Sequence, residues 1–386
     1  MNNTTVPPAS MRPRYQLLDG LRGVAALVVI LFHFGEGFAT SSVDQMMNHG
    51  YLAVDFFFVL SGFVIGYAYD GRWANHRMTS GRFMLRRIIR LQPMVVLGAV
   101  LGLAAYIIGG CQRWDGAAVS AWPMAVAFIL AILVLPVFPG TDADVRGNNE
   151  MFPLNGPEWS LFFEYIGSLL YAFILHKLSD RALRTVVVLS AIGLAACALD
   201  NLSGGYTTGF GWSIAANGIN GIGFIGGFFH LSFSFSVGLI LSRGFRPMHI
   251  RGAFWICSAM IVALCICPYI TTDGAPSILN AAYDTAVTLF ILPAIVYIGA
   301  SGQTTDTFSS QICEGLGQLS YPVYIIHYPM MYLFYGWVWT NQISFADALP
   351  VCGAILVAIP LMAFLALKYY DEPLRAYLTR KWLDRK

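Results

Sequence analysis

The sequence predicts an all-α polytopic membrane protein with about ten transmembrane helices and one re-entrant or interfacial segment. Of the 386 residues, 57% are hydrophobic and only 11% are charged, whereas soluble domains carry about 25% charged residues. Such a chain lacks the polar side chains to cover a globule in water. This composition excludes a soluble enzyme, a disordered chain and a nucleic-acid-binding protein. The formal net charge of +2 is too small to attract a partner by itself.

Eleven apolar segments follow one another along the chain, and most have the length of about 20 residues that a helix needs to cross a bilayer. They centre on residues 21–38, 51–69, 91–110, 122–138, 159–176, 184–200, 219–241, 252–270, 281–300, 319–339 and 348–369. We predict one membrane domain over residues 15–376, a cytoplasmic tail at 1–14 and a basic cytoplasmic tail at 377–386. No small-residue cleavage site follows the first apolar run, so we expect it to be retained as a span.

Basic residues gather in alternate linkers, which predicts that both termini are cytoplasmic. The clusters are Arg12, Arg14 and Arg22; Arg72, Arg77, Arg82, Arg86, Arg87 and Arg90; Lys177, Arg181 and Arg184; Arg243, Arg246 and Arg251; and the stretch 368–386. Termini on one side require an even number of crossings, so one segment must fail to span. The segment 122–138 is the shortest and is bracketed by Pro123, Pro136 and Pro139. We predict that it is re-entrant or interfacial on the extracytoplasmic side.

Several ionisable side chains fall within apolar segments, where a charge costs about 2.5–3.5 kcal/mol on insertion scales. Arg22 and His33 are three helical turns and about 20° apart, so both project from one face of the first helix. Asp55 opens the next span at the depth of His33. Because a carboxylate beside an imidazole fixes its tautomer, we predict that His33 is a base oriented by Asp55. The alternative is a charge pair that only joins two helices.

Three other ionisable groups also have structural interpretations. His230 is followed by several serines and is typical of a hydrogen-bonded packing histidine. Asp284 falls near the end of a span and is compatible with an interfacial position. His327 lies among tyrosines, so it is either a structural hydrogen-bond centre or part of a site. The cysteines show neither CxxC pairs nor a nearby histidine at zinc-ligand spacing, so we expect no metal site and no disulfide framework.

Arg86, Arg87 and Arg90 recur at helical spacings immediately before the third span. Guanidinium groups bind phosphates bidentately, which favours a phosphate clamp at the membrane surface. The alternative is ordinary positive-inside anchoring with contacts to lipid headgroups. Either interpretation places the run on the cytoplasmic side.

Six motifs, taken in order, resemble those of the membrane acyltransferase-3 family from about residue 15 to 375. They are LLDGLRGVAALVVILFHF, VDFFFVLSGFVIG, RFMLRRIIRLQP, GPEWSLFFEYIG, LGQLSYPVYIIHYP and DEPLR. The family patterns fall on Arg22 and His33, on Arg87 and Arg90, and on Trp159, Ser160, Leu161 and Glu164. Gln92 replaces an aromatic or apolar residue, and Glu372 directly precedes Pro373 where a residue usually intervenes; neither departure touches the expected chemistry.

The resemblance implies an O-acyltransferase of a bacterial inner membrane. Its donor is acyl-CoA, usually acetyl-CoA, which is a co-substrate rather than a bound cofactor. Its acceptor is a hydroxyl of a carbohydrate or related compound, and a surface glycan, a lipid-linked sugar and a secreted natural product all fit. Membrane lipids surround the protein, and no nucleic acid is involved.

These observations together predict a mechanism with named roles. Arg22, Arg86, Arg87 and Arg90 bind the phosphates of acyl-CoA. His33, oriented by Asp55, removes the proton of the acceptor hydroxyl. The candidates for supporting or oxyanion-stabilising roles are Ser61, Glu164, Tyr321, Tyr324 and His327. The alternative function is a transporter or flippase that uses the buried charges as a proton relay, although the two halves of the chain show no repeat.

Overall fold

The computed structural model describes residues 15–41, 43–138, 140–200, 213–215, 218–220, 222–272, 274–302 and 306–384. The predicted tail at residues 1–14 lies outside these ranges. Within them the long helices are α1 (Gln16–Glu36), α2 (Leu52–Ala74), α3 (Ser80–Ile108), α4 (Ala121–Ile132), α5 (Glu158–Phe173), α6 (Asp180–Asp200), α7 (Ile222–Arg243), α8 (Ala253–Ile266), α9 (Ile278–Ala286), α10 (Leu292–Ser301), α11 (Thr307–Asn341), α12 (Phe345–Ala366) and α13 (Glu372–Trp382).

Short elements complete the description. A 3₁₀ turn, η1 (Leu175–Lys177), follows α5, and the π-helical turns η2 (Val287–Ile291) and η3 (Leu367–Asp371) join α9 to α10 and α12 to α13. Two small antiparallel hairpins pair β1 (Ser213–Ala215) with β2 (Gly218–Asn220) and β3 (Thr271–Thr272) with β4 (Ala275–Pro276). The helix α13 continues through residue 376, where we predicted the domain to end.

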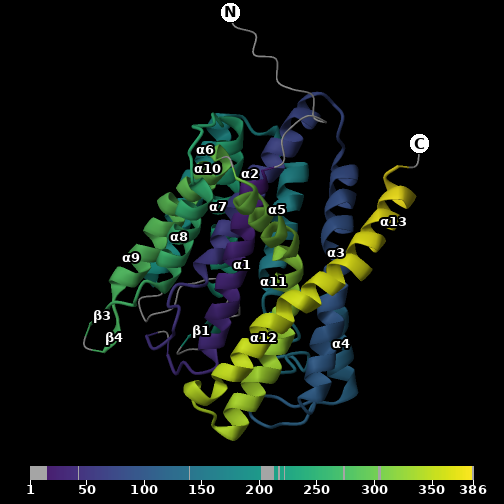
Figure 1. The fold of residues 1–386 in the computed structure, drawn as a ribbon, viewed down its shortest axis with the longest axis vertical. Coiled ribbons are helices and arrows are strands. Elements are labelled where there is room, and N and C mark those ends of the chain that lie inside the picture. Colours follow the sequence, from purple (N-terminus) through teal and green to yellow (C-terminus); the bar gives the residue numbers. More distant parts are fainter. Residues whose placement is uncertain are drawn as a thin grey trace, which may run out of the picture.

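Figure 1 shows the helices running lengthwise in one bundle, with the start of α3 and the end of α13 toward the same end. Arg82 of α3 donates a hydrogen bond to the carbonyl oxygen of Leu383 at 3.3 Å. Arg243, at the end of α7, contacts Asp70 of α2 at 2.8 Å and Asp180 of α6 at 3.1 Å. We call this end of the bundle the basic end and the other the distal end.

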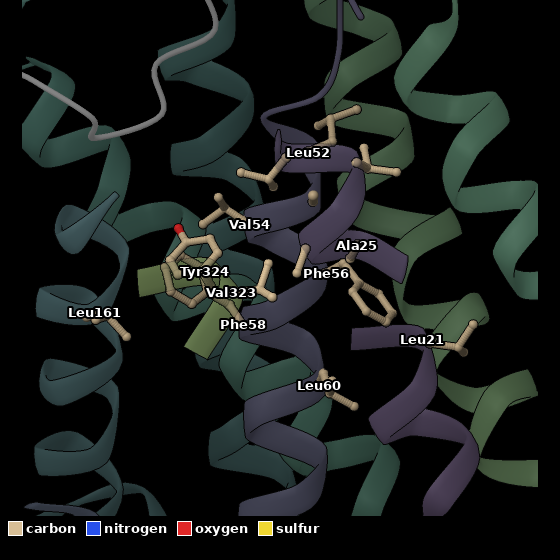
Figure 2. Close-up of a cluster of buried hydrophobic side chains, with 14 of the residues drawn as sticks. Leu21, Ala25, Leu52, Val54, Phe56, Phe58, Leu60, Leu161, Val323 and Tyr324 are labelled. Carbon is tan, nitrogen blue, oxygen red and sulfur yellow. The ribbon is translucent and has the colours of Figure 1, made fainter. Parts of the chain in front are cut away.

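Two helix pairs form the centre of the bundle: α1 packs along α11, and α2 packs along α7. Figure 2 shows part of their shared apolar core, in which Leu21 of α1, Phe56 of α2 and Val323 of α11 gather. The pair α2 and α7 approaches closely at glycines, as is common between membrane helices. A methyl group at Gly62 would lie 2.1 Å from the carbonyl oxygen of Phe235, and one at Gly238 would lie 2.2 Å from that of Val59.

The predicted all-α polytopic fold is confirmed. Among the described residues, eight helical stretches are long and apolar enough to cross a membrane, and α4 and α8 are shorter apolar helices. Every predicted apolar segment falls on at least one helix, although part of 219–241 lies outside the described residues. The number of ten crossings stays a prediction.

The segment predicted to be re-entrant contains α4, which has only 12 residues. Such a helix is about 18 Å long, well short of the roughly 30 Å hydrocarbon core. The irregular chain after it is buried at several positions, including Met151, Leu154 and Asn155. Non-helical backbone at membrane depth is tolerated where it is buried in protein or lines a cavity. The interpretation of a non-crossing segment therefore agrees with the length of α4.

Candidate active site

A cavity of about 520 Å³ opens in the distal half of the bundle, and we call it the distal chamber. The end of α1 supplies His33 and Glu36, and α11 supplies a row of aromatic side chains that includes Tyr328, Tyr332 and Tyr335. The irregular segment after α4 supplies Asn148 and Glu150, while the linker before α2 supplies Gln45, Asn48 and Tyr51. The chamber thus combines aromatic surface with a few polar groups, as small-molecule sites do.

His33 is held at the wall of this chamber by its own helix. Its Nδ1 lies 2.5 Å from Oε2 of Glu36, one turn further along α1. Tyr335 donates hydrogen bonds to the carbonyl oxygen of His33 at 2.7 Å and to Glu36 at 3.1 Å. Because Nδ1 is engaged by a carboxylate, the other ring nitrogen, Nε2, is the one that can accept a proton. The contact with Glu36 thus fixes the orientation of the imidazole ring at the chamber wall.

The predicted pairing of His33 with Asp55 is wrong. Asp55 contacts Nδ1 of His230 on α7 at 2.7 Å and accepts a hydrogen bond from Ser234 at 3.3 Å. Asp55 does lie in the first turn of α2, as predicted. The rotation of α2 about its axis, however, turns this carboxylate toward α7. Asp55 instead forms a pair with His230 that joins α2 to α7. His230 is the hydrogen-bonded packing histidine that its sequence context indicated.

Glu36 was missed at the sequence level although a signal for it exists. It follows His33 by three residues in HFGE, a spacing that places two side chains on one helix face. Its position at the end of the apolar run is also typical of a linker residue. The helix extends through Glu36, so the carboxylate lies beside the imidazole instead.

His327 lies against His33, with ring centroids 5.3 Å apart in a stacked arrangement. It is fully buried, and its Nδ1 lies 3.2 Å from the carbonyl oxygen of Val323. That contact requires the Nδ1–H form, and Nε2 has no partner among the described residues. His327 therefore supports the ring of His33 by contact.

A second cavity, of about 570 Å³, opens at the basic end, and we call it the basic pocket. Four arginines line it: Arg22, Arg72, Arg90 and Arg375. Arg22 donates to Oγ of Ser320 at 2.7 Å and to the carbonyl oxygen of Gly317 at 3.2 Å. The carboxylates of Asp19, Asp371 and Glu372 also belong to the wall. The pocket is therefore a charged site with a surplus of guanidinium groups.

Three of the four arginines expected to bind phosphate, Arg22, Arg87 and Arg90, line one narrow cavity between the two described above, whereas Arg86 does not. Arg90 is exposed into the basic pocket and has no hydrogen-bond or ion-pair partner among the described residues. Arg87 is buried and forms an ion pair with Glu164 of α5, and it donates to Ser168 at 3.1 Å. Arg86 lines neither cavity. Arg87 and Arg90 are three residues apart and share one helix face, while Arg86 points away from it.

A narrow cavity of about 100 Å³, which we call the neck, lies between these two. It shares Arg22, Arg90 and Tyr321 with the basic pocket and Tyr324 with the distal chamber. Apolar side chains such as Phe57 form much of its wall. The three cavities therefore follow one another along the bundle, from guanidinium groups at one end to an imidazole at the other.

The predicted hydroxyl donors line the neck, but each already has a partner. Ser61 donates to Glu164 at 3.3 Å, and Tyr321 donates to the carbonyl oxygen of Leu91 at 2.7 Å. The hydroxyl of Tyr324 lies 2.7 Å from Oγ of Ser160. Any role as an oxyanion donor requires these hydrogen bonds to rearrange.

Glu150 adds a second carboxylate to the distal chamber. It is buried, accepts a hydrogen bond from Asn148 at 2.7 Å, and is also bonded by the hydroxyl of Tyr332. Burial raises the pKa of Glu150 to about 7, while the charge of Arg146 acts in the opposite direction. Arg146 itself lies over the ring of Tyr332, 3.3 Å from its centroid. Among the described residues, no cluster of three or more candidate ligands for a metal ion is present.

Comparisons with known proteins give a family match for most of the chain. Residues 15–367 match the model of the acyltransferase domain family Acyl_transf_3. Protein 2 in the picA locus of Rhizobium radiobacter is 33% identical over 193 residues, which are 48% of this chain and 96% of that protein. No solved structure matches the chain significantly.

Two further relatives are similar over shorter stretches. A protein of Komagataeibacter xylinus, named as the membrane-bound transacylase BcsY, is 33% identical over 25% of this chain and 20% of its own length. A Staphylococcus aureus (strain COL) protein named as an O-acetyltransferase is 33% identical over 24% of this chain and 14% of its own length. The matched stretch therefore covers a small part of these two relatives.

Proposed function

Because the chain belongs to the acyltransferase family whose model covers nearly all of it, we propose that it transfers an acetyl group from acetyl-CoA to a hydroxyl in the distal chamber. His33 is the general base of this proposal. The observation that supports it most is the succession of basic pocket, neck and distal chamber. It offers a phosphate site, an apolar passage and a base in the order that a CoA thioester needs.

The basic pocket suits the donor. Coenzyme A carries phosphates at one end, and guanidinium groups bind phosphates through charge-assisted, bidentate hydrogen bonds. Arg90 and Arg22 line both the pocket and the neck, so they are placed to bind the diphosphate where the pantetheine arm enters. Arg72 and Arg375 also line the pocket and join our assignment of phosphate ligands. Arg86 lines none of the three cavities, and Arg87 lines the neck but is paired with Glu164.

The chemical step uses His33 and Glu36. Nε2 of His33 takes the proton of the acceptor hydroxyl while the hydroxyl oxygen attacks the thioester carbonyl carbon. Glu36 stabilises the imidazolium that forms. The C–S bond then breaks, the thiolate takes the proton from His33, and the products are an ester and free CoA. His33 ends in the neutral form in which it began.

The distribution of basic residues indicates the orientation of the protein in the membrane. The linkers at the basic end carry the excess of arginine and lysine, so this end and both termini face the cytoplasm, where acetyl-CoA is made. The distal chamber then opens toward the extracytoplasmic side of a bacterial inner membrane. Its aromatic and amide-rich wall suits the hydroxyl of a carbohydrate or related acceptor. Family membership favours this enzyme over the transporter that the sequence left open.

The test compares His33→Ala with His76→Asn, which changes an exposed histidine in the linker between α2 and α3. Each full-length variant is expressed in a strain from which the gene is deleted. Mass spectrometry then measures acetyl esters on surface glycans and secreted products. Purified protein is assayed in parallel for release of free CoA. We expect His33→Ala to lower transfer by about 100-fold or more, the usual contribution of a general base, and His76→Asn to match the wild type. Retention of a tenth of the activity in correctly inserted His33→Ala would remove this histidine from the mechanism.

A further inference from the structure

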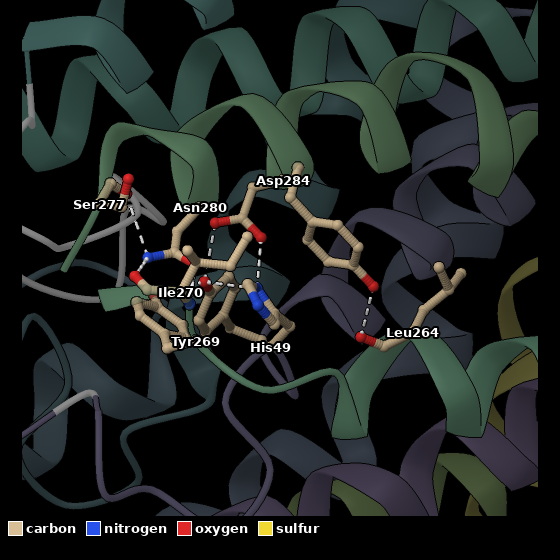
Figure 3. A network of polar contacts seen from close by, with 9 residues as sticks. His49, Leu264, Tyr269, Ile270, Ser277, Asn280 and Asp284 are labelled. Carbon is tan, nitrogen blue, oxygen red and sulfur yellow. Dashed lines mark hydrogen bonds and ion pairs between the residues drawn. The ribbon is translucent and has the colours of Figure 1, made fainter. Parts of the chain in front are cut away.

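A buried polar cluster behind the wall of the distal chamber takes no part in the mechanism above. Nδ1 of His49 lies 2.6 Å from Oδ1 of Asp284, and each residue is only 1% exposed. The hydroxyl of Tyr51 donates to Oδ2 of the same carboxylate at 2.8 Å and lies 2.8 Å from the hydroxyl of Tyr269. Figure 3 shows His49, Asp284 and Tyr269 in this network. Its members come from the linker before α2, from α9 and from the linker after α8.

The network reaches the chamber through its two tyrosines, because both Tyr51 and Tyr269 line that cavity. A carboxylate that receives two hydrogen bonds is an acceptor only, so Asp284 takes the single hydroxyl hydrogen of Tyr51. Tyr269 must then donate its own hydrogen to the oxygen of Tyr51. Burial raises the pKa of Tyr269 to about 12, so the hydroxyl is neutral at physiological pH. The oxygen of Tyr269 is left to accept a hydrogen bond.

The position of Tyr269 is fixed by the residue that follows it. Asn280 of α9 accepts a hydrogen bond from the backbone N–H of Ile270 at 2.8 Å and donates to its carbonyl oxygen at 2.8 Å. Asn280 is 4% exposed, and it also donates to the carbonyl oxygen of Ser277 at 3.1 Å. The ring of Tyr269 additionally stacks on that of His49, with centroids 4.8 Å apart. A hydroxyl held from both sides in this way is pre-organised for binding.

We propose that Tyr269, polarised through Tyr51 and Asp284, is a binding subsite for a second hydroxyl of a polyhydroxylated acceptor such as a pyranoside. This inference rests on the proposed function, in which the first hydroxyl of the acceptor lies at His33. The chain of donors runs toward Asp284, so the subsite takes a group that donates a hydrogen bond. It accepts a hydroxyl and does not accept a fluorine or an ether oxygen in the same place.

The experiment measures binding without requiring transfer. The probes are methyl β-D-glucopyranoside, methyl β-D-galactopyranoside and methyl α-D-mannopyranoside, each with its monodeoxy and deoxyfluoro analogues. Binding to the purified full chain is followed through tryptophan fluorescence, since Trp114, Trp159 and Trp339 line the chamber. The variant is Tyr269→Phe. The matched control is Tyr283→Phe, which removes a hydroxyl from the same cluster that donates to the carbonyl oxygen of Leu264 at 2.9 Å and does not line the chamber.

In the wild type we expect one ring position at which the deoxy and deoxyfluoro analogues both bind about three- to tenfold more weakly than the parent, as for one neutral hydrogen bond. In Tyr269→Phe, the Kd of the parent compound should rise by the same factor, and the parent and its analogue should bind equally. Tyr283→Phe should behave as the wild type. A merely structural role for Tyr269 would weaken all the probes together and preserve their differences.

Several results would overturn the subsite. These are the absence of saturable binding by any pyranoside, an unchanged Kd for the parent in Tyr269→Phe, or full discrimination between parent and analogue retained in that variant. Release of free CoA is measured separately. Pyranoside binding that depends on Tyr269, without any consumption of acetyl-CoA, would keep the subsite and contradict the proposed donor.

Discussion

Two histidine–carboxylate pairs in this molecule have nearly the same geometry and opposite surroundings. His33 and Glu36 approach to 2.5 Å and line the distal chamber, while His230 and Asp55 approach to 2.7 Å between α2 and α7 and line none of the three cavities described above. The first pair lies within one helix, and the second joins two. The pairing distance therefore does not distinguish a candidate catalytic pair from a structural one. The two pairs differ in their access to a cavity.

The sharpest way to break this comparison is to neutralise each carboxylate in turn. Glu36→Gln keeps the shape but removes the charge that stabilises imidazolium, so we expect kcat to fall by about 100-fold or more with little change in Tm. Asp55→Asn leaves a buried histidine without its carboxylate, and breaking such a pair costs about 3–5 kcal/mol of stability. The folded fraction of Asp55→Asn should keep its kcat. Turnover and thermal unfolding of both variants measure the two effects, and a loss of kcat specific to Asp55→Asn would reverse our assignment.

A second comparison concerns two carboxylates near the distal end, Glu150 and Asp44. Burial raises the pKa of Glu150 to about 7 from an ordinary 4.5, so the folded state holds a proton that the unfolded state has already released at pH 6. Stability should therefore fall as the pH rises from about 4.5 to 7, by up to about 3 kcal/mol. The facing charged groups are Arg146 and Glu36. Glu150→Gln should flatten this part of the profile.

The pKa of Asp44 is shifted in the opposite direction to that of Glu150. Hydrogen bonds from the side chains and backbone of Thr40 and Ser41 hold its pKa well below the usual range. A depressed pKa contributes stability that is present at neutral pH and is lost only in strong acid. Asp44→Asn should therefore leave the profile between pH 5 and 7 unchanged. A Glu150→Gln variant with the wild-type slope in that window would show that another group is responsible.

Gly62 and Gly81 allow a similar comparison, between two glycines of which only one is closely packed. A methyl group at Gly62 would overlap the carbonyl oxygen of Phe235, whereas nothing lies within 4 Å of one at Gly81. We expect Gly62→Ala to lower stability by about 1–3 kcal/mol, as overpacking does. Gly81→Ala, near the start of α3, should be neutral or stabilising because alanine favours the helix. Thermal unfolding in one detergent compares them, and equal Tm values would contradict the close approach of α2 and α7.

The fold could be predicted well because the features that determine it, hydrophobic segments and clusters of basic residues, are local along the sequence. Segment length, basic linkers and the short α4 all depend on neighbouring residues. The site was predicted only in part. Arg22 and His33 were predicted to share one face of the first helix, and each lines a cavity of the bundle. Which helix faces Asp55 depends on the rotation of α2 against its neighbours, and that follows from packing at residues such as Gly62, which no linear pattern reports.

The arginines before the third span show the same limit and give the last prediction. Arg90 is exposed into the basic pocket, while Arg87 is paired with Glu164. Lysine keeps the charge but loses the bidentate guanidinium geometry. Arg90→Lys should therefore raise the KM for acetyl-CoA by about tenfold, which corresponds to about 1.4 kcal/mol. Arg87→Lys should leave this KM within about twofold and lower Tm instead, because its hydrogen bonds go to protein groups.

Initial rates against acetyl-CoA concentration, at fixed acceptor, separate these two outcomes. The effect of Arg90→Lys should fall on the donor alone, since the acceptor binds in the distal chamber beyond the neck. Wild-type donor kinetics in Arg90→Lys would leave Arg90 as a topological anchor, as positive-inside bias requires of any such residue. A raised donor KM in Arg87→Lys with an unchanged Tm would mean that the ion pair with Glu164 opens when CoA binds. In that case the difference between the two arginines would belong to the unliganded state and not to the working enzyme.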